Sequence, residues 1–320
     1  MNLLVSPFSD PYWNLAAEEI LLKNSQENYL FLYINQPCVV VGKHQNTLKE
    51  INSIFLHNNN ILIARRLSGG GAVYHDEGNL NFSYIQSVDI GVELSYKNLS
   101  QSILSFLMEH FQEIKLSDRN DLTLFGKKIS GSAMHVYKNR VLSHGTLLIN
   151  CNLNNLSAAL KGNPDRFEGK SIESKRSPVM NLSEVYQEFT PANLVKGIFL
   201  HLLKSHPEHL LYQIPPELNF SISELVSAKY STPQWIYGYS PKYTYRNTIN
   251  LEGKSIPYQL EIEKGIILRV NIEQENELNG DITHIFNTLI GVSHNISSML
   301  EGPFKTINSD IKRQLLLSLI

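Results

Sequence analysis

The chain has 320 residues, 42% of them hydrophobic and 18% charged, which is typical of a soluble globular protein with one large domain or with one large and one small domain. The formal net charge of −2 gives no overall attraction to nucleic acid or to an anionic membrane, so any anion binding must be local. Two distant cysteines argue against a disulfide framework and favour a reducing, cytoplasmic setting, and we expect neither a secretion signal nor a membrane-spanning segment.

The first part of the chain alternates between helical and strand-like sequence. Asp10 and Pro11 are typical of a helix cap and a first helical residue, so a helix is expected over about 12–23. Apolar, β-rich runs predict strands at residues 29–34, 38–42 and 60–64. Alternating polar and apolar residues predict a half-buried strand at 79–85, and a helix is expected at 99–111.

Strand-like runs separated by short turns follow in the middle of the chain. They predict antiparallel strands at residues 122–124, 128–136 and 141–149. Residues 164–178 are rich in charged residues and poor in apolar ones, so we expect a mobile loop of the kind that often covers a site. A helix capped by Thr190 is expected at 191–204.

The composition changes between residues 231 and 245, where aromatic residues crowd together with two prolines and a glycine. The sequence beyond this point predicts two strands and two short helices, at 255–262, 266–272, 282–289 and 307–319. These elements are enough for a small second domain. We therefore expect a domain of residues 1–241 followed by an accessory domain of residues 242–320.

One stretch combines two features of an anion-binding loop. It reads RRLSGGGAVYHD, from Arg65 to Asp76. Three consecutive glycines let backbone N–H groups converge on an anion, and an arginine offers a planar donor fork suited to carboxylate or phosphate. A flexible surface turn with solvated arginines is the alternative. Because apolar, strand-like residues flank the loop on both sides, we expect it to be held in place.

Two adjacent lysines begin one of the predicted strands. Lys127 and Lys128 point to opposite faces if both lie on that strand. Lys128 is followed closely by the small residues of 130–133, which leave room for a ligand, and a lysine there can neutralise a phosphate or a carboxylate. A solvated surface lysine is the alternative. No P-loop, no G-x-S-x-G and no G-x-G-x-x-G after a strand is present.

Histidines offer further candidates. His75 and His144 each follow strand-like sequence, and a catalytic role and a hydrogen-bonded structural role are about equally compatible with that setting. His206 and His209 superficially suggest a metal pair. The proline between them and the lack of an obvious third ligand argue against zinc.

Five separated motifs together resemble the lipoate–protein ligase family, in the order in which that family carries them. They read DPYWNLAAEE (10–19), RRLSGGGAVYHD (65–76), RNDL (119–122), KISGSA (128–133) and HGTLL (144–148). The resemblance implies an α+β, lipoate/biotin ligase-like catalytic domain with mixed, largely antiparallel sheets and flanking helices, plus a small α+β C-terminal domain. It implies a monomer with no nucleic-acid or membrane partner.

The resemblance also implies a two-step reaction. Lipoate and ATP, with Mg²⁺, give lipoyl-AMP and pyrophosphate. A lysine of an acceptor protein then takes the lipoyl group. The implied acceptors are the lipoyl domains of 2-oxoacid dehydrogenase E2 subunits and the glycine-cleavage H protein.

The resemblance assigns roles by motif position. Lys128 is the implied catalytic residue, in contact with both the lipoyl carboxyl group and the phosphate, and Asp121 is the implied magnesium contact. The implied ATP-binding residues are Arg66, Gly71, Ala72, Val73, Tyr74 and Lys128. The implied lipoate-binding residues are Ser68, Gly69, Gly70, Gly71, His75, Lys128 and His144. Strand phase adds four candidates for an apolar slot that would hold the lipoate tail: Val40, Val41, Leu80 and Ile149.

The segment 169–182 matches the family's adenylate-binding loop. Pro178 and Met180 depart from the commoner pattern there, which affects individual contacts rather than the position of the loop.

Two alternatives fit the same fold. A cysteine-dependent octanoyl or lipoyl transferase needs an activated thiolate, but Cys38 lies inside an apolar strand run and Cys151 just after one. Those transferases carry a cysteine shortly before the lysine strand, where this chain has none in 116–121. A non-catalytic lipoate-binding protein needs no phosphate contacts, so the glycine loop together with Arg66 and Lys128 argues against it.

Overall fold

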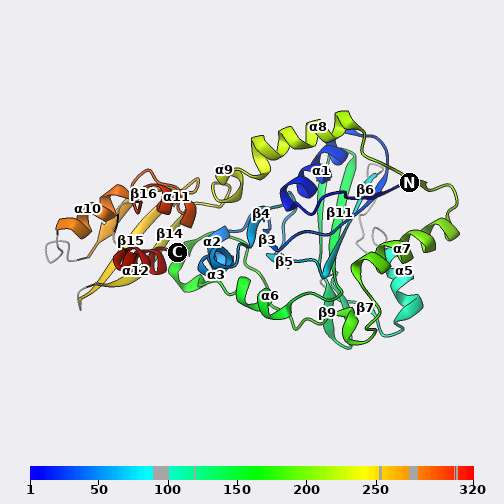
Figure 1. Cartoon of the computed structure of the whole chain (residues 1–320), viewed down its shortest axis with the longest axis horizontal. Helices are drawn as coiled ribbons and strands as arrows, with labels where there is room; N and C mark the ends of the chain where they lie inside the picture. Colours follow the sequence, from blue (N-terminus) through cyan, green and yellow to red (C-terminus); the bar gives the residue numbers. More distant parts are fainter. Residues whose placement is uncertain (89–100, 119, 252–253, 274–279, 306, 308) are drawn as a thin grey trace.

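The computed structural model describes residues 1–88, 101–118, 120–251, 254–273, 280–305, 307 and 309–320. The expected α+β class is confirmed. A large part of the chain is built around a six-stranded sheet, and a smaller part contains a four-stranded sheet (Figure 1). Within the described residues, no helix combines the length and the apolar character needed to cross a membrane.

The six-stranded sheet has the order β10-β11-β6-β2-β1-β13. These strands are Ser132–Tyr137, Arg140–Leu148, Asn79–Ser87, Tyr29–Tyr33, Asn2–Val5 and Leu210–Leu211. β1 is parallel to both neighbours, whereas the other pairs are antiparallel. The prediction that the strand at 79–85 is half-buried is wrong. β6 is buried on both faces, because α1 packs on one side and side chains of α5 and α7 pack on the other.

Two three-stranded sheets carry the motifs of interest. One has the order β4-β3-β5, made of Leu62–Arg65, Cys38–Val41 and Val73–His75. The other has the order β7-β8-β9, made of Lys115–Leu116, Leu122–Leu124 and Lys127–Ser130. The glycine-rich segment connects β4 to β5 across the central strand β3, so both of its ends are fixed by strand pairing.

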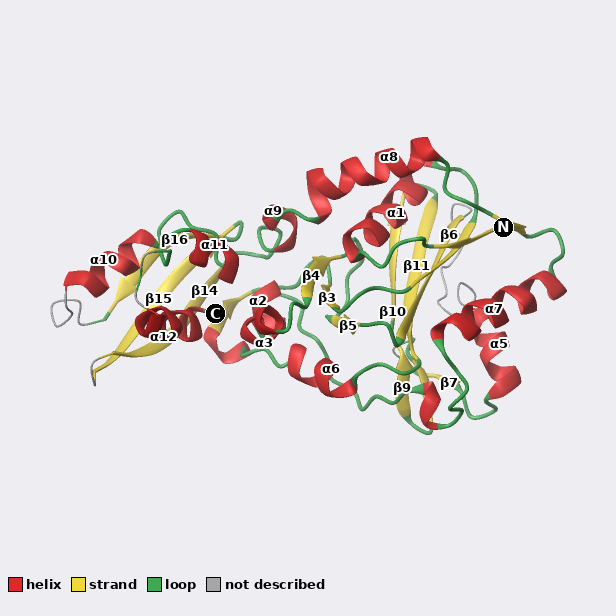
Figure 2. Cartoon of the chain, viewed as in Figure 1, coloured by secondary structure: helices red, strands yellow, loops and turns green. Residues whose placement is uncertain are grey.

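The helices of the larger part cover these sheets (Figure 2). They are α1 (Pro11–Asn24), α2 (Thr47–Glu50), α3 (Ser53–Asn58), α5 (Gln101–His110), α6 (Leu153–Ala159), α7 (Pro191–Ser205), α8 (Pro216–Leu225) and α9 (Pro233–Ile236). Asp10 caps α1 by accepting a hydrogen bond from the Tyr12 N–H group, and Thr190 caps α7 through Asn193, as predicted. Residues 99 and 100 of the predicted α5 lie outside the described residues, and α2, α3, α6, α8 and α9 were not predicted.

In the smaller part, the described residues form a sheet with the order β12-β14-β15-β16 and three α-helices. Its elements are Phe167–Gly169, Tyr243–Leu251, Lys254–Glu263, Ile266–Ile272, α10 (Gly280–Thr288), α11 (Ile296–Glu301) and α12 (Ser309–Leu319). The two predicted strands and two predicted helices are confirmed, whereas β14 and α11 were missed. The prediction of a loop throughout 164–178 is wrong for its first six residues. Pro164–Arg166 form a turn of 3-10 helix, and β12 pairs with β14.

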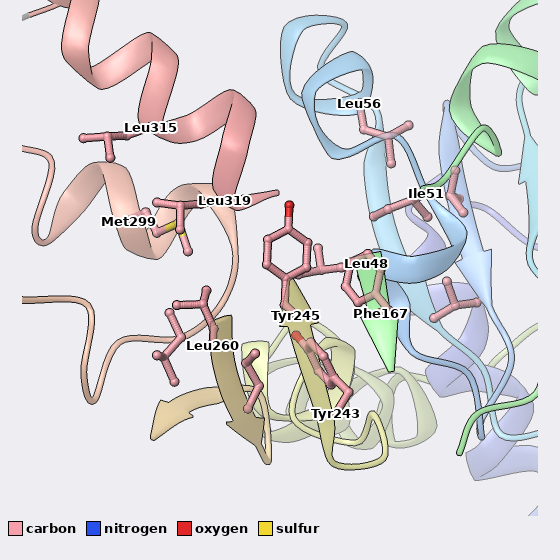
Figure 3. Close-up of a cluster of buried hydrophobic side chains, with 14 of the residues drawn as sticks. Leu48, Ile51, Leu56, Phe167, Tyr243, Tyr245, Leu260, Met299, Leu315 and Leu319 are labelled. Atoms are coloured by element: carbon pink, nitrogen blue, oxygen red, sulfur yellow. The ribbon is translucent and has the colours of Figure 1, made fainter. Parts of the chain in front are cut away.

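A continuous apolar cluster joins the two parts (Figure 3). Leu48 and Leu56 of the α2–α3 region contribute to the same cluster as Phe167, Tyr245 and Leu319. Since these residues come from both sides, the smaller part packs directly on the helices beside the glycine-rich loop.

Arg65 provides a polar connection between the same two regions. Its fully buried guanidinium group donates to five carbonyl groups and two hydroxyl groups, those of Gly42, Lys43, Gln45, Trp235, Ile236, Thr47 and Ser240. Burial lowers the pKa of Arg65 to about 10, which still leaves the group charged at neutral pH. The first arginine of the pair therefore fixes α9 to β4 and does not line a ligand cavity.

Candidate active site

Two cavities adjoin each other across β9. The first has a volume of about 330 Å³ and extends between α1, β3 and the glycine-rich loop, and the second has a volume of about 420 Å³ and extends toward α6. Both are lined by Ala72, Val73, Lys128, Gly131, Thr146 and residues 173–175. A ligand in the first cavity and a ligand in the second cavity would therefore both contact the shared wall, which contains Lys128.

Lys128 points toward the cavities, whereas Lys127 is exposed, as strand alternation predicts. The Lys128 ammonium nitrogen lies 3.0 Å from Oδ1 of Asp121. Gly131 lies close beside it, and a Cβ atom there would lie 3.0 Å from Nζ and would displace the ammonium group. The β9 backbone also pairs with the end of the loop predicted at 164–178, because the Lys128 N–H group donates to the Pro178 carbonyl at 2.8 Å.

Arg66 shapes the glycine-rich loop from inside. Its Nε donates to the Ser68 hydroxyl at 3.0 Å, and Nη1 donates to the Val40 carbonyl at 3.0 Å. Nη2 donates to the carbonyl groups of Gly69, at 2.6 Å, and Gly71, at 2.8 Å. The buried guanidinium group thus turns the loop carbonyls toward itself, which is the physical reason that the loop is held in place.

Glycine is required at two positions, one within this loop and one packed against it. Gly70 has φ +89°, in the left-handed region that side chains disfavour. A Cβ atom on Gly42, which follows β3, would lie 2.1 Å from the Gly70 carbonyl oxygen. The loop therefore packs backbone against backbone.

A chain of buried hydrogen bonds runs from the loop into α1. The Ser68 hydroxyl lies 2.6 Å from Nε2 of His144, and Nδ1 of His144 lies 3.0 Å from the Glu18 carboxylate. Glu18 also accepts hydrogen bonds from Tyr33, at 3.0 Å, and from Ser83. Because a carboxylate only accepts, Nδ1 of His144 carries a proton and donates it to Glu18. This series of hydrogen bonds resembles a Ser-His-Glu catalytic triad. Ser68 is only 1% exposed and lines neither cavity, so it is not placed to act as a nucleophile.

Residues 170–178, called the covering segment below, contact the glycine-rich loop through Ser174. The Ser174 hydroxyl accepts from the Ala72 N–H group at 2.9 Å, and Glu50 accepts both the N–H and the hydroxyl group of Ser174, at 3.1 and 2.5 Å. An ion pair of 2.7 Å joins Lys49 to Glu173. Burial raises the pKa of Glu50 above its usual value. Lys49 and Glu50, at the end of α2, therefore position the covering segment over the wall that the two cavities share.

The structure brings most of the predicted site residues together. The first cavity is lined by Arg66, Gly70, Gly71, Ala72, Val73, His75, Asp121, Lys128 and His144, and the second by Ala72, Val73, Tyr74 and Lys128. Ser68 and Gly69 line neither, and Ser68 reaches the site through Arg66 and His144. Arg119, in one of the recognised motifs, lies outside the described residues.

The apolar slot differs from the prediction. Val40 lines the first cavity, but the assignment of Val41, Leu80 and Ile149 is wrong, because all three are packed inside the hydrophobic clusters. Leu15 of α1 and Tyr33 of β2 line the cavity instead. Sequence reasoning missed Leu15 because strand phase does not reveal which helix covers a strand, and it did not single out Tyr33 although this residue lies on a predicted strand.

Neither cysteine is suited to be a nucleophile. Cys38 and Cys151 are buried, and neither lines the two cavities. Burial raises the pKa of both thiols, which disfavours the reactive thiolate.

Comparison with known proteins supports the assignment of these cavities as an active site. Residues 10–203 match the family model described as the lipoyl protein ligase A/B catalytic domain. The chain belongs to this family. It is 37% identical over 296 residues to lipoate–protein ligase 1 of Staphylococcus aureus, an alignment that covers 92% of this chain and 90% of that protein. The chain is accordingly a lipoate–protein ligase, and the prediction of this activity is confirmed.

Solved structures of lipoate–protein ligases share the fold. LipL1 of P. falciparum, in complex with lipoate, superposes with a TM-score of 0.62 at 25% identity and covers 99% of each chain. A lipoate–protein ligase A bound with ATP superposes with a TM-score of 0.61 at 24% identity and covers 74% of this chain and 98% of its own. The fold of this ligase is therefore that of proteins crystallised with each of the two small substrates.

Proposed function

We propose that this ligase joins lipoate to ATP across Lys128, forming lipoyl-AMP and pyrophosphate, and then passes the lipoyl group to a lysine of an acceptor protein. The observation that carries the proposal is that the two cavities share the wall in which Lys128 lies. The lipoate tail occupies the first cavity, against Leu15, Tyr33 and Val40, and the nucleotide occupies the second, beside Tyr74.

The chemistry needs positioning more than a protein nucleophile. An oxygen of the lipoate carboxylate attacks the α-phosphorus of ATP, the new O–P bond forms, and pyrophosphate leaves with the electrons of the broken bond. The two reacting groups are both anionic and repel each other. The Lys128 ammonium group lies where it can attract both, and such preorganised charge lowers the barrier most in a site shielded from water.

The glycine-rich loop supports this alignment. Its residues 71–74 contribute to the walls of the two cavities, so its backbone lies beside both substrates. Arg66 acts by holding the loop carbonyls away from the anions, since its donors engage four loop and strand oxygens, at Ser68, Val40, Gly69 and Gly71. Ser68, His144 and Glu18 fix Arg66 in turn.

A magnesium ion fits this proposal through Asp121. Mg²⁺ in nucleotide sites is held by one or two carboxylates together with substrate phosphates, and Asp121, which lines the first cavity, places one carboxylate oxygen 3.0 Å from Lys128 on the shared wall. The described residues contain no cluster of three or more His, Cys, Asp or Glu side chains that could hold a metal without a substrate. When bound, the ion supplies further neutralisation of phosphate charge.

The acceptors follow from the family activity. We propose the lipoyl domains of 2-oxoacid dehydrogenase E2 subunits and the glycine-cleavage H protein, with the ligase acting as a monomer in the cytoplasm. We also propose residues 1–241 as the catalytic domain and 242–320 as the accessory domain. Pairing of β12 with β14 supports a direct connection between the covering segment and the accessory domain.

Lipoate-dependent exchange of labelled pyrophosphate into ATP tests the adenylation step. Exchange that needs lipoate and no acceptor is the expected result, and a chain that binds lipoate without any exchange would instead be a lipoate-binding protein. The double variant Cys38→Ser/Cys151→Ser separates the ligase from a cysteine-dependent transferase. The variant keeps lipoate-dependent exchange if the proposal is correct, whereas a thioester route is lost with the thiols.

A further inference from the structure

One polar atom of the first cavity lacks a partner. His75, on β5, lines this cavity, and its ring is 4% exposed. Its Nε2 atom is buried and has no hydrogen-bond partner among the described residues. Buried polar groups are normally satisfied, so an unpaired one in a cavity wall points to a missing ligand atom.

The neighbouring hydrogen bonds decide whether Nε2 is a donor or an acceptor. The Asn14 amide nitrogen donates to the Phe8 carbonyl at 3.1 Å, and a carbonyl only accepts, so this fixes the Asn14 side chain. The same nitrogen donates to Oδ1 of Asn35 at 2.8 Å. Asn35 must then present its amide nitrogen to Nδ1 of His75, which lies at 3.0 Å.

Nδ1 of His75 is therefore an acceptor, and the ring proton sits on Nε2. Burial lowers the pKa of His75 to about 3, with Arg66 and His144 contributing, so the ring is neutral at physiological pH. The structure thus presents one fixed, uncharged N–H donor to the cavity.

The position of this donor relates it to one end of the substrate. His75 lines the first cavity only, whereas Lys128 lies in the wall shared with the second. The carboxyl group of an acyl substrate belongs beside Lys128, where it meets the nucleotide. β5 leads away from the shared wall, because Val73 lines both cavities, whereas His75, two residues further on the same strand face, lines only the first. His75 consequently faces the other part of the acyl chain, together with Leu15, Tyr33 and Val40.

We propose that the His75 Nε2–H group donates a hydrogen bond to a sulfur atom of the lipoate ring and so selects sulfur-bearing acyl chains over saturated ones. This inference rests on the proposed placement of lipoate in the first cavity. Divalent sulfur is a weak acceptor. A plain alkyl chain of similar length offers no acceptor and leaves the N–H group unsatisfied, which is how a buried donor discriminates between substrates.

The test is a cycle that changes the donor and the acceptor separately. Calorimetric titration compares lipoate with 5-cyclopentylpentanoate, in which carbon replaces both ring sulfurs, on the wild type, His75→Leu and His75→Gln. The preference for lipoate over the carbocyclic acid, expressed as a ratio of Kd values, is expected to be about fivefold larger in the wild type than in His75→Leu. His75→Gln keeps a donor near the Nε2 position and retains a preference larger than that of His75→Leu.

An equal preference for lipoate in the wild type and in His75→Leu overturns the inference. The wild-type comparison decides it even if His75→Leu fails to fold, because equal affinities for the two acids also overturn it. Pyrophosphate exchange on the same samples keeps the two proposals distinct. If lipoate supports exchange but the two acids bind equally well, only the role of His75 is ruled out. If lipoate binds more tightly than the carbocyclic acid but exchange is absent, the role of His75 is supported and the adenylation step is ruled out.

Discussion

The Lys128 ammonium nitrogen, on the wall that both cavities share, lies 3.0 Å from Oδ1 of Asp121, which lines the first cavity. Asp121 precedes β8, and Thr123 of β8 lies opposite Lys128 in the antiparallel pairing. The hairpin therefore holds the lysine at the point where we propose that the carboxylate and the α-phosphate meet. Asp121 keeps the ammonium group in this orientation before either substrate binds.

Replacing Gly131 with alanine tests how accurately Lys128 must be placed. The new Cβ atom would lie 3.0 Å from both Cε and Nζ of Lys128, and only this flexible side chain needs to move. Gly131→Ala is expected to change the free energy of unfolding by less than about 0.5 kcal/mol. Displacement of the ammonium group should lower kcat/KM for lipoate-dependent exchange by about 10- to 100-fold. Full activity in a folded variant would contradict this positioning.

Removing the Ser68 hydroxyl tests the buried chain behind the loop. Ser68→Ala leaves Nε of Arg66 and Nε2 of His144 without this partner, which should cost about 1–3 kcal/mol in the free energy of unfolding and about tenfold in kcat/KM. The matched control is Ser53→Ala, because Ser53 is also buried but its hydroxyl has no hydrogen-bond partner among the described residues. Urea unfolding and exchange kinetics measure both effects. Similar changes in the free energy of unfolding and in kcat/KM for the two variants would show that the buried hydrogen bonds behind the loop do not support the site.

His294 predicts a pH dependence of stability. Its ring lies between the Tyr243 hydroxyl and the Leu319 carbonyl, and burial lowers its pKa from 6.5 to about 4. Between these values the unfolded chain binds a proton that the folded chain does not. Its contribution to the free energy of unfolding therefore falls, by about 1.4 kcal/mol per pH unit, as the pH decreases through this window.

Urea unfolding at about pH 7 and about pH 5 measures this contribution. His294→Gln should reduce the loss of stability on acidification, whereas the same substitution at the exposed His57 should leave it unchanged. An equal pH dependence in the wild type and His294→Gln would contradict the argument.

Local patterns made part of the site predictable. A glycine run between two strand-like segments indicates a held loop, and strand alternation separates Lys127 from Lys128. Roles that depend on distant contacts were not accessible. Glu18 reaches His144 across 126 residues, and Glu50 reaches Ser174 across 124. No periodicity in the sequence relates such pairs.

The error at β6 has a specific physical cause. Period-two alternation indicates that one face of a strand is polar, and Asn79, Asn81 and Ser83 do share one face. That face is buried, because Asn81 donates to the Tyr33 carbonyl and Ser83 donates to Glu18. The polar strand face is therefore part of the protein interior, where Asn81 lines the first cavity, and not a solvent-facing surface.

Formation of lipoyl-AMP by Lys128→Ala and Lys127→Ala, measured in a single turnover without acceptor, tests the central claim most directly. The two lysines are neighbours on β9, yet only Lys128 lines the cavities. We predict that Lys128→Ala forms no detectable lipoyl-AMP and that Lys127→Ala forms it at close to the wild-type rate. Equal losses in the two variants, or full activity in Lys128→Ala, would contradict the claim that both substrates meet at Lys128.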